Sequence, residues 1–151
     1  MIAIIDYGAG NLRSVASAFE AIGRHPLITN QPGDLAKAAA IVLPGVGAFG
    51  DGMESLRRFG LIEALAEAVL EKKKPYLGIC LGLQFLGTES LEHGTHAGLG
   101  WIKGRVERIV TNSNEFRIPH IGWNNLHLQR PSPLFAGLPP EPVFYFVHSL
   151  S

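Results

Sequence analysis

The stretch that decides the fold is residues 75–84, Pro-Tyr-Leu-Gly-Ile-Cys-Leu-Gly-Leu-Gln. Its apolar first half predicts a strand. Gly78 and Gly82 lie two positions either side of Cys80, which is the single cysteine of the sequence. A residue at a sharp turn from strand to helix needs small neighbours at those positions, because the backbone folds back closely on itself there. The spacing therefore predicts that Cys80 stands exposed at the C-terminal edge of a sheet, with a helix beginning at Leu81.

A cysteine in this position is a candidate nucleophile. The first N–H groups of a helix are unpaired and form the positive end of its dipole. Both effects favour the thiolate, which is the form that attacks carbon. The alternative is a buried structural cysteine at an apolar junction, which is common for a free cysteine. Because of the two glycines, we prefer the interpretation of Cys80 as a nucleophile.

Composition narrows the class of protein. The 151 residues are 46% hydrophobic, which is enough for one domain with a core. Thirteen basic residues balance thirteen acidic ones, and no basic run stands out, so nucleic acid and anionic membranes are poor candidates for a partner. The apolar runs are shorter than the roughly 20 residues of a membrane span, and the N-terminus has the pattern of a first strand rather than a leader. One cysteine excludes an internal disulfide and a multi-cysteine zinc site, so we expect no metal, no cofactor and a cytoplasmic protein.

Apolar runs and helical periodicities alternate along the first 87 residues. We expect strands at residues 2–5, 26–29, 40–43 and 75–79. We expect helices at residues 12–22, 35–39 and 61–74, and two more, one capped by Asp51 and one that begins after Cys80. Such alternation predicts an α/β fold with a doubly wound, mostly parallel sheet and helices on both faces. Ligands bind such sheets beyond the carboxyl ends of the strands, where both Cys80 and the glycine-rich loop 45–50 would lie.

The chain changes in character after residue 87. Glycines punctuate short segments, residues 103–110 alternate like a half-exposed strand, and residues 143–147 are apolar and aromatic. Residues 118–124 carry turn residues. We expect an antiparallel elaboration of the sheet in the C-terminal half.

A cysteine nucleophile needs a base and two N–H donors for the oxyanion that develops during attack on a carbonyl group. The amide of Leu81, the residue after the nucleophile, is one natural donor. The second is expected from the Val46–Gly47 region, in the glycine-rich loop that follows the neighbouring strand.

Two motifs together, PGVGAF at residues 44–49 and GICLGLQ at residues 78–84, resemble the class I (triad) glutamine amidotransferases. Within that family, residues 5–12, 119–124 and 144–149 look like the glutaminase subunits of imidazole glycerol phosphate synthases. The resemblance covers residues 1–151 and depends on the combination, because no single motif suffices. It implies a flavodoxin-like fold in one domain over residues 1–151.

The resemblance also implies a reaction and a partner. Cys80 would attack the side-chain amide of glutamine and release ammonia to a (β/α)₈-barrel cyclase subunit, which makes imidazole glycerol phosphate and AICAR in histidine biosynthesis. By the same resemblance, glutamine would be held by Gly47, Gln84, Ser149 and Leu150. The partner would meet Asn11, Ile121, Trp123 and Asn124. Two alternatives remain: another class I glutaminase, of pyridoxal phosphate or anthranilate synthesis, and a non-catalytic interaction module of the same fold.

The sequence departs from the family's pattern in one respect. The base and its orienting acid belong to a His-x-Glu motif, and none of the six histidines is followed two residues later by Glu. We therefore expect that the fold is incomplete, that its C-terminal segment is missing, and that the 151-residue chain does not itself turn over glutamine. His148 aligns with a non-catalytic histidine, so we expect a structural role for it.

Overall fold

The computed structural model describes residues 1–111 and 117–151. The chain forms two compact units, Met1–Glu107 and Arg108–Ser151. The expectation of one domain over residues 1–151 remains a prediction.

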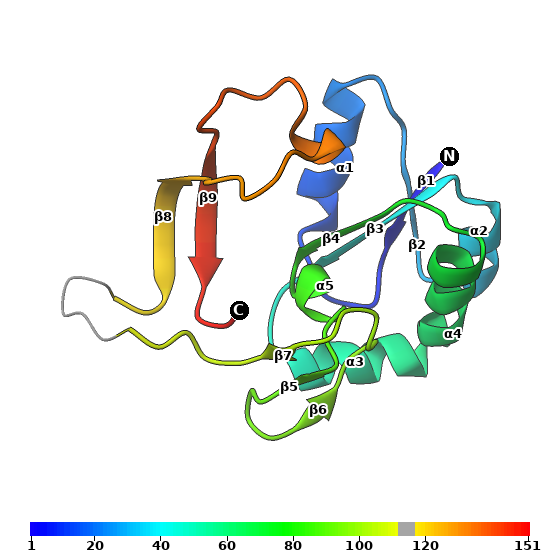
Figure 1. Ribbon diagram of the computed structural model, residues 1–151. Helices are drawn as coiled ribbons and strands as arrows, with labels where there is room; N and C mark the ends of the chain where they lie inside the picture. The colour runs from blue at the N-terminus through cyan, green and yellow to red at the C-terminus, as the bar shows by residue number, and fades with distance from the viewer. Residues whose placement is uncertain (112–116) are drawn as a thin grey trace. The chain divides into compact units, whose positions relative to one another are not determined.

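The first unit is built on a four-stranded parallel sheet with the strand order β2-β1-β3-β4 (Figure 1). Its strands are β1 (Ile2–Ile5), β2 (Leu27–Thr29), β3 (Ala40–Gly45) and β4 (Tyr76–Cys80). Its helices are α1 (Leu12–Ala21), α2 (Pro32–Lys37), α3 (Phe49–Arg58), α4 (Leu61–Ala66) and α5 (Leu81–Gln84), and a π-helical segment, Glu67–Glu71, continues α4. The parallel α/β sheet predicted from the sequence is confirmed.

The two central strands of this sheet, β1 and β3, are buried on both faces, which explains why they are continuous apolar runs. Ile4 and Val42 pack with Ala16 of α1 on one face. Side chains alternate along a strand, so Ile5 and Leu43 point to the other face, and both are fully buried there. Figure 1 shows α2 and α4 on the side of the sheet opposite to α1.

Parallel pairing brings three turns to one edge of the sheet. β1 lies between β2 and β3, and β3 pairs with β4 in a register that sets Gly45 opposite Cys80. The turns that follow β1, β3 and β4 therefore leave at the carboxyl edge, where ligands bind in doubly wound sheets.

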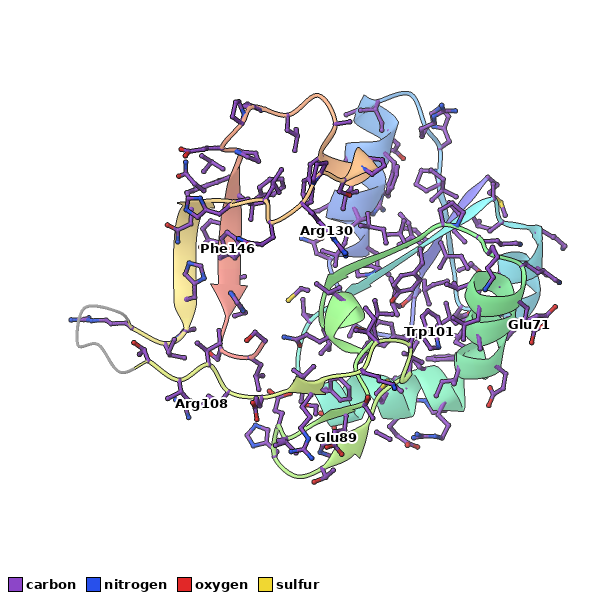
Figure 2. The ribbon with its side chains drawn as sticks, in the orientation of Figure 1. Glu71, Glu89, Trp101, Arg108, Arg130 and Phe146 are labelled. Atoms are coloured by element: carbon purple, nitrogen blue, oxygen red, sulfur yellow. The ribbon has the colours of Figure 1, made fainter. Side chains whose placement is uncertain are left out.

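Short strands complete the two units. In the first, β5 (Glu89–Ser90) pairs antiparallel with β6 (His96–Ala97) and parallel with β7 (Arg105–Val106). An ion pair of 2.7 Å joins Arg105 to Glu89 across β5 and β7; Figure 2 labels Glu89. In the second, β8 (His120–Asn125) and β9 (Val143–His148) form an antiparallel pair, and Pro133–Phe135 is a 3₁₀ turn. Antiparallel strands in the C-terminal half are therefore confirmed.

Two expectations about helix starts are wrong. The second helix begins at Pro32 rather than residue 35, because proline is well suited to the first turn, where its missing N–H has no partner to lose. The cap of α3 is Ala48, not Asp51, which instead lies within the first helical turn.

Two expectations in the C-terminal half are also wrong. Residues 118–124 do not form a turn, since His120–Asn125 is strand β8. Pairing with β9 outweighs the turn propensity of these residues, and Gly122 adapts with φ +142°. The strand expected at residues 103–110 is confined to Arg105–Val106, apart from an isolated bridge between Arg108 and Leu150.

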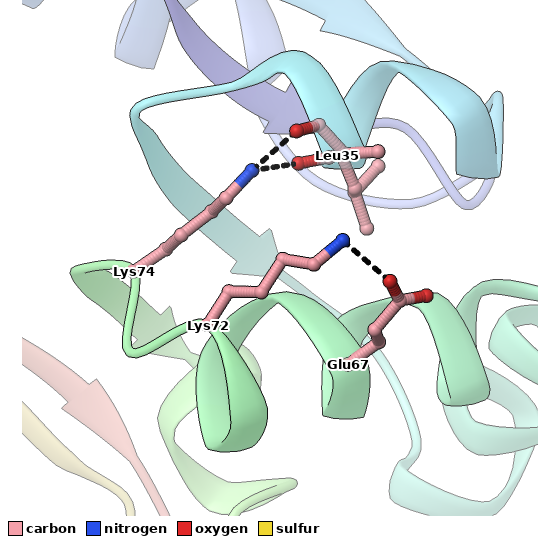
Figure 3. Close-up of polar contacts among 5 residues, drawn as sticks. Leu35, Glu67, Lys72 and Lys74 are labelled. Carbon is pink, nitrogen blue, oxygen red and sulfur yellow. Dashed lines mark hydrogen bonds and ion pairs between the residues drawn. The ribbon is translucent and has the colours of Figure 1, made fainter.

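Hydrogen bonds from Lys74 connect the segment before β4 to α2 (Figure 3). The Nζ atom of Lys74 donates to the carbonyl oxygens of Leu35 and Ala36, at 2.8 and 2.6 Å. These carbonyls belong to the last turn of α2, where a cation is favourable. Lys72 instead pairs with Glu67 at 2.5 Å. These contacts hold the chain that leads into the cysteine strand.

Candidate active site at the carboxyl edge of the sheet

Cys80 occupies the position that the sequence predicted. It is the last residue of β4, it is exposed, and α5 begins at the next residue. Its backbone has φ 54° and ψ −115°, which a residue with a side chain rarely adopts. A strained, exposed cysteine between a parallel strand and a helix has the geometry of a nucleophile elbow.

The glycines around Cys80 are required by packing. A Cβ on Gly82 would lie 1.7 Å from the carbonyl oxygen of Leu43, and one on Gly78 would lie 2.5 Å from the carbonyl oxygen of Gly82. Neither contact is possible between non-bonded atoms. The two glycines thus let α5 turn back against β3 and β4, as the spacing predicted. The hydroxyl of Tyr76 adds a hydrogen bond of 2.7 Å to the carbonyl of Gly82.

The predicted oxyanion loop lies beside the elbow. Gly45 pairs with Cys80, and neighbouring strands are about 4.8 Å apart, so Val46 and Gly47 follow directly after the residue opposite Cys80. Val46 is 56% exposed, and Gly47 has φ +94°, a conformation that glycine adopts without strain. The assignment of Val46, Gly47 and Leu81 as oxyanion donors stays a prediction that this arrangement allows.

The helix after Cys80 is shorter than expected. α5 has four residues, a single turn, so the contribution of its dipole to thiolate formation is smaller than that of a full helix. Gln84 is the last residue of this turn and is half-buried. It lies one turn beyond the nucleophile, as the spacing indicates.

Tyr7 is a feature of the site that the sequence did not indicate. Its side chain is fully buried, and a Cβ on Gly45 would lie 2.4 Å from its hydroxyl. Among the described residues the hydroxyl has no hydrogen bond of normal geometry, although it lies close to the amide of Val46. Burial raises the pKa of Tyr7 to about 12; a thiolate at Cys80 acts in the same direction, and the Val46 amide opposes it. The phenol therefore lies beneath the junction of loop and elbow.

Glu92 is the second feature that sequence reasoning missed. Its carboxylate accepts the N–H of Phe49 at 2.7 Å, and Phe49 is the first residue of α3, directly after Val46, Gly47 and Ala48. A carboxylate at this end of a helix satisfies an unpaired donor and complements the dipole. Because 43 residues separate the two partners, no local pattern could have revealed the contact.

The remaining predicted site residues lie in other parts of the chain. Asn11 precedes α1, and its side chain accepts the N–H of Ser14 at 3.3 Å, so it caps that helix. The other predicted residues belong to the second unit: Ile121, Trp123 and Asn124 on β8, and Ser149 and Leu150 after β9. Side chains alternate on β8, so Asn124 points to the opposite face from Ile121 and Trp123.

His148 is a structural histidine, as the sequence indicated. One ring nitrogen lies 3.0 Å from the carbonyl of Leu150, and the other lies 3.1 Å from a ring nitrogen of His120. Both nitrogens are therefore engaged.

No group of three or more metal-ligating side chains occurs in residues 1–111 and 117–151. None of the described helices has the length and apolar character that crossing a membrane requires.

Comparison with known proteins agrees with this geometry. Residues 3–151 match the model of the family described as glutamine amidotransferase class-I. A crystal structure described as glutamine amidotransferase superposes on 97% of this chain and 71% of its own, with a TM-score of 0.73 at 18% identity, which shows the shared fold. The chain is a member of the class I glutamine amidotransferase family.

Two relatives are much more similar in sequence. Imidazole glycerol phosphate synthase subunit HisH 1 of Campylobacter jejuni subsp. jejuni, strain 81-176, is 50% identical over 149 residues, which cover 99% of this chain and 74% of the relative. Imidazole glycerol phosphate synthase subunit HisH of Oceanobacillus iheyensis is 47% identical over 149 residues, covering 99% and 72%. Within the class I amidotransferases, the chain belongs with the HisH subunits.

Proposed function

We propose that this protein is the glutamine-hydrolysing subunit of an imidazole glycerol phosphate synthase. The observation that carries the proposal is an exposed cysteine in a strained elbow, opposite a glycine loop. The similarity to HisH subunits supplies the substrate, glutamine, and the pathway, histidine biosynthesis.

The reaction follows from the groups present at the elbow. The sulfur of Cys80 attacks the side-chain carbonyl carbon of glutamine, and the amides of Leu81 and of Val46 or Gly47 stabilise the negative oxygen. The amide nitrogen leaves as ammonia once it is protonated, and a thioester remains. Water then attacks the thioester and releases glutamate and the free thiol.

The resemblance to the family assigns residues to the substrate and to the partner. Gly47, Gln84, Ser149 and Leu150 would hold the polar ends of glutamine. Asn11, Ile121, Trp123 and Asn124 would face a (β/α)₈-barrel cyclase, which takes up the ammonia in the cytoplasm.

Labelling of Cys80 by a glutamine-analogue diazo ketone tests this function on the chain itself. We expect stoichiometric labelling at Cys80, slowed by glutamine but not by glutamate or asparagine at the same concentration. Cys80→Ser is the control for the site of labelling. A chain that ignores the analogue, or that glutamine does not protect, is a non-catalytic module and contradicts the proposal.

Turnover is a separate test. Within these 151 residues no histidine stands in a His-x-Glu motif, and general acid–base catalysis contributes about 10²–10⁴-fold. We therefore expect that the 151-residue chain labels at Cys80 but hydrolyses glutamine at least about 100-fold more slowly than a chain that also carries the motif. A glutaminase assay with the cyclase and its ligand measures this, and equal rates would show that the base lies within residues 1–151.

A further inference from the structure

A continuous line of hydrogen bonds runs through the second unit. The side-chain amide nitrogen of Asn124 forms a hydrogen bond with one ring nitrogen, Nε2, of His120. The other nitrogen of this ring, Nδ1, lies 3.1 Å from Nε2 of His148. Nδ1 of His148 lies 3.0 Å from the carbonyl oxygen of Leu150. Four residues are thereby linked from β8 to the segment after β9.

With both rings neutral, the hydrogens of this line can be placed in only one way. A carbonyl oxygen only accepts, so Nδ1 of His148 carries the proton, and its Nε2 must then accept. His120 consequently donates from Nδ1, and its Nε2 accepts from the amide of Asn124. The direction is thus set from Asn124 to Leu150, and each ring has its proton on Nδ1.

The packing around the rings fixes their orientation. His120 and His148 are directly opposite in the register of β8 and β9. The ring of His120 stacks on Phe146, labelled in Figure 2, with centroids 4.7 Å apart and planes inclined by 20°.

The line ends on a segment that is held at two further points. The carbonyl of Ser149 accepts the N–H of Ile109 at 2.9 Å, and Leu150 forms a bridge with Arg108. The bond from His148 is the side-chain contribution to this arrangement. It closes a turn from residue 148 to the carbonyl of residue 150, which aims the peptide groups between them.

We propose that His120 and Asn124 are positioning residues, which act through His148 to hold Ser149 and Leu150 in the conformation that binds glutamine. This inference rests on the proposed function, because the glutamine-binding role of Ser149 and Leu150 belongs to that proposal. It differs from a role in chemistry, since neither residue needs to touch the substrate.

The protonation pattern gives a direct spectroscopic test. In a chain labelled with ¹⁵N-histidine, two-dimensional NMR at pH 8.5 distinguishes protonated from unprotonated ring nitrogens. We expect His120 and His148 to carry the proton on Nδ1, whereas exposed His127 serves as the reference with the Nε2–H form that free imidazole prefers. In Asn124→Ala, His120 should shift towards the Nε2–H form. Nε2–H on either ring in the unmodified chain overturns the inference.

Glutamine affinity tests the positioning role. It is measured on the 151-residue chain as the glutamine concentration that halves the rate of Cys80 alkylation by iodoacetamide. Loss of the hydrogen bond from His120 to His148 predicts a rise of about 3- to 10-fold in this concentration for His120→Phe, which retains the stacking on Phe146. His120→Gln, which keeps one donor and one acceptor, should restore most of the affinity, and His127→Phe is the matched control.

The possible outcomes separate the two proposals. If the two rings have the expected protons but His120→Phe binds glutamine as the unmodified chain does, the line is structural only and the positioning role is wrong. If glutamine fails to protect the unmodified chain while the rings behave as expected, the proposed function fails. Circular dichroism shows whether His120→Phe has lost its fold. In that case Asn124→Ala, a substitution at an exposed position, is the deciding variant, and its glutamine affinity should fall by about 3- to 10-fold.

Discussion

Two structural requirements coincide at Cys80. Its side chain stands exposed at the end of β4, and its backbone turns sharply into α5. The result is a positive φ in a residue with a Cβ, which costs on the order of 1–3 kcal/mol. The surrounding glycines and strands impose this conformation, so the strain is local to the functional residue.

Replacing Cys80 by glycine should release this strain. Cys80→Ala removes the thiol and keeps the Cβ, whereas Cys80→Gly removes both. We expect Cys80→Gly to be more stable than Cys80→Ala by about 1 kcal/mol, because glycine adopts positive φ freely. Urea unfolding of the two variants measures the difference. A less stable glycine variant would show that the elbow is not strained.

Tyr7 makes stability depend on alkaline pH. Its pKa is raised to about 12 in the folded chain, against about 10 when exposed, so the folded state holds the proton more tightly. This contribution is fully present below pH 10 and is lost as the pH rises from about 10 to about 12. Tyr7→Phe should therefore lose less stability than the unmodified chain between pH 9 and pH 11.5, by urea unfolding. Tyr145→Phe, at a 53% exposed tyrosine, should behave as the unmodified chain does. If the stability of the unmodified chain and of both variants changed with pH in the same way, the role of Tyr7 burial would be refuted.

At the scale of elements, the site depends on how closely α5 approaches β3. Gly82 is in that contact, and a side chain there would overlap the carbonyl of Leu43. Gly33, in the first turn of α2, has open space around its Cβ position. The two glycines thus serve different purposes, although both lie within the first turn of a helix.

Alanine at these two positions should have opposite effects. We expect Gly82→Ala to destabilise the chain by about 3 kcal/mol or more, since overlap with backbone cannot be relieved by a rotamer change. Gly33→Ala should be neutral or stabilising by up to about 1 kcal/mol, because alanine favours helix. Thermal unfolding of both variants is the measurement. Equal effects would contradict the packing at the elbow.

The hairpin in the second unit has two faces of different character. One carries the line of histidines. On the other, an edge-to-face contact joins Trp123 and Tyr145, with ring centroids 5.4 Å apart. This apolar face is exposed and comprises Ile121, Trp123, Val143, Tyr145 and Val147. Exposed apolar patches of this kind mark interaction surfaces.

At the scale of the whole molecule, the partner surface can be tested with one tryptophan. Trp123 is 71% exposed, and tryptophan is enriched among the residues that dominate binding energy. Trp123→Ala should weaken binding of the barrel cyclase by about 30-fold or more, which corresponds to about 2 kcal/mol. Leu134→Ala, at a 67% exposed leucine of the same unit outside the hairpin, should change it less than about threefold. Calorimetric titration with the cyclase measures both. Similar effects of the two substitutions would place the interface elsewhere.

Local patterns were sufficient for the parallel sheet and for the elbow. Continuous apolar runs are typical of strands that are covered on both faces. The glycines around Cys80 indicate that the following helical turn packs closely against the strand. The strand β8 was missed for a related reason. Its glycine and asparagines indicate a turn by composition, while its pairing with β9 is a contact between distant segments.

The sequence by itself therefore determined the fold class and the residue presented at the carboxyl edge of the sheet, because both depend on spacing within about ten residues. Only the tertiary structure decided that Tyr7 lies beneath Gly45, that Glu92 accepts the first N–H of α3, and that His120 contacts His148. Each of these contacts joins residues of different segments, 28 to 43 positions apart in the sequence. A periodic pattern reports only on residues that are near one another in the sequence, so it cannot predict such contacts.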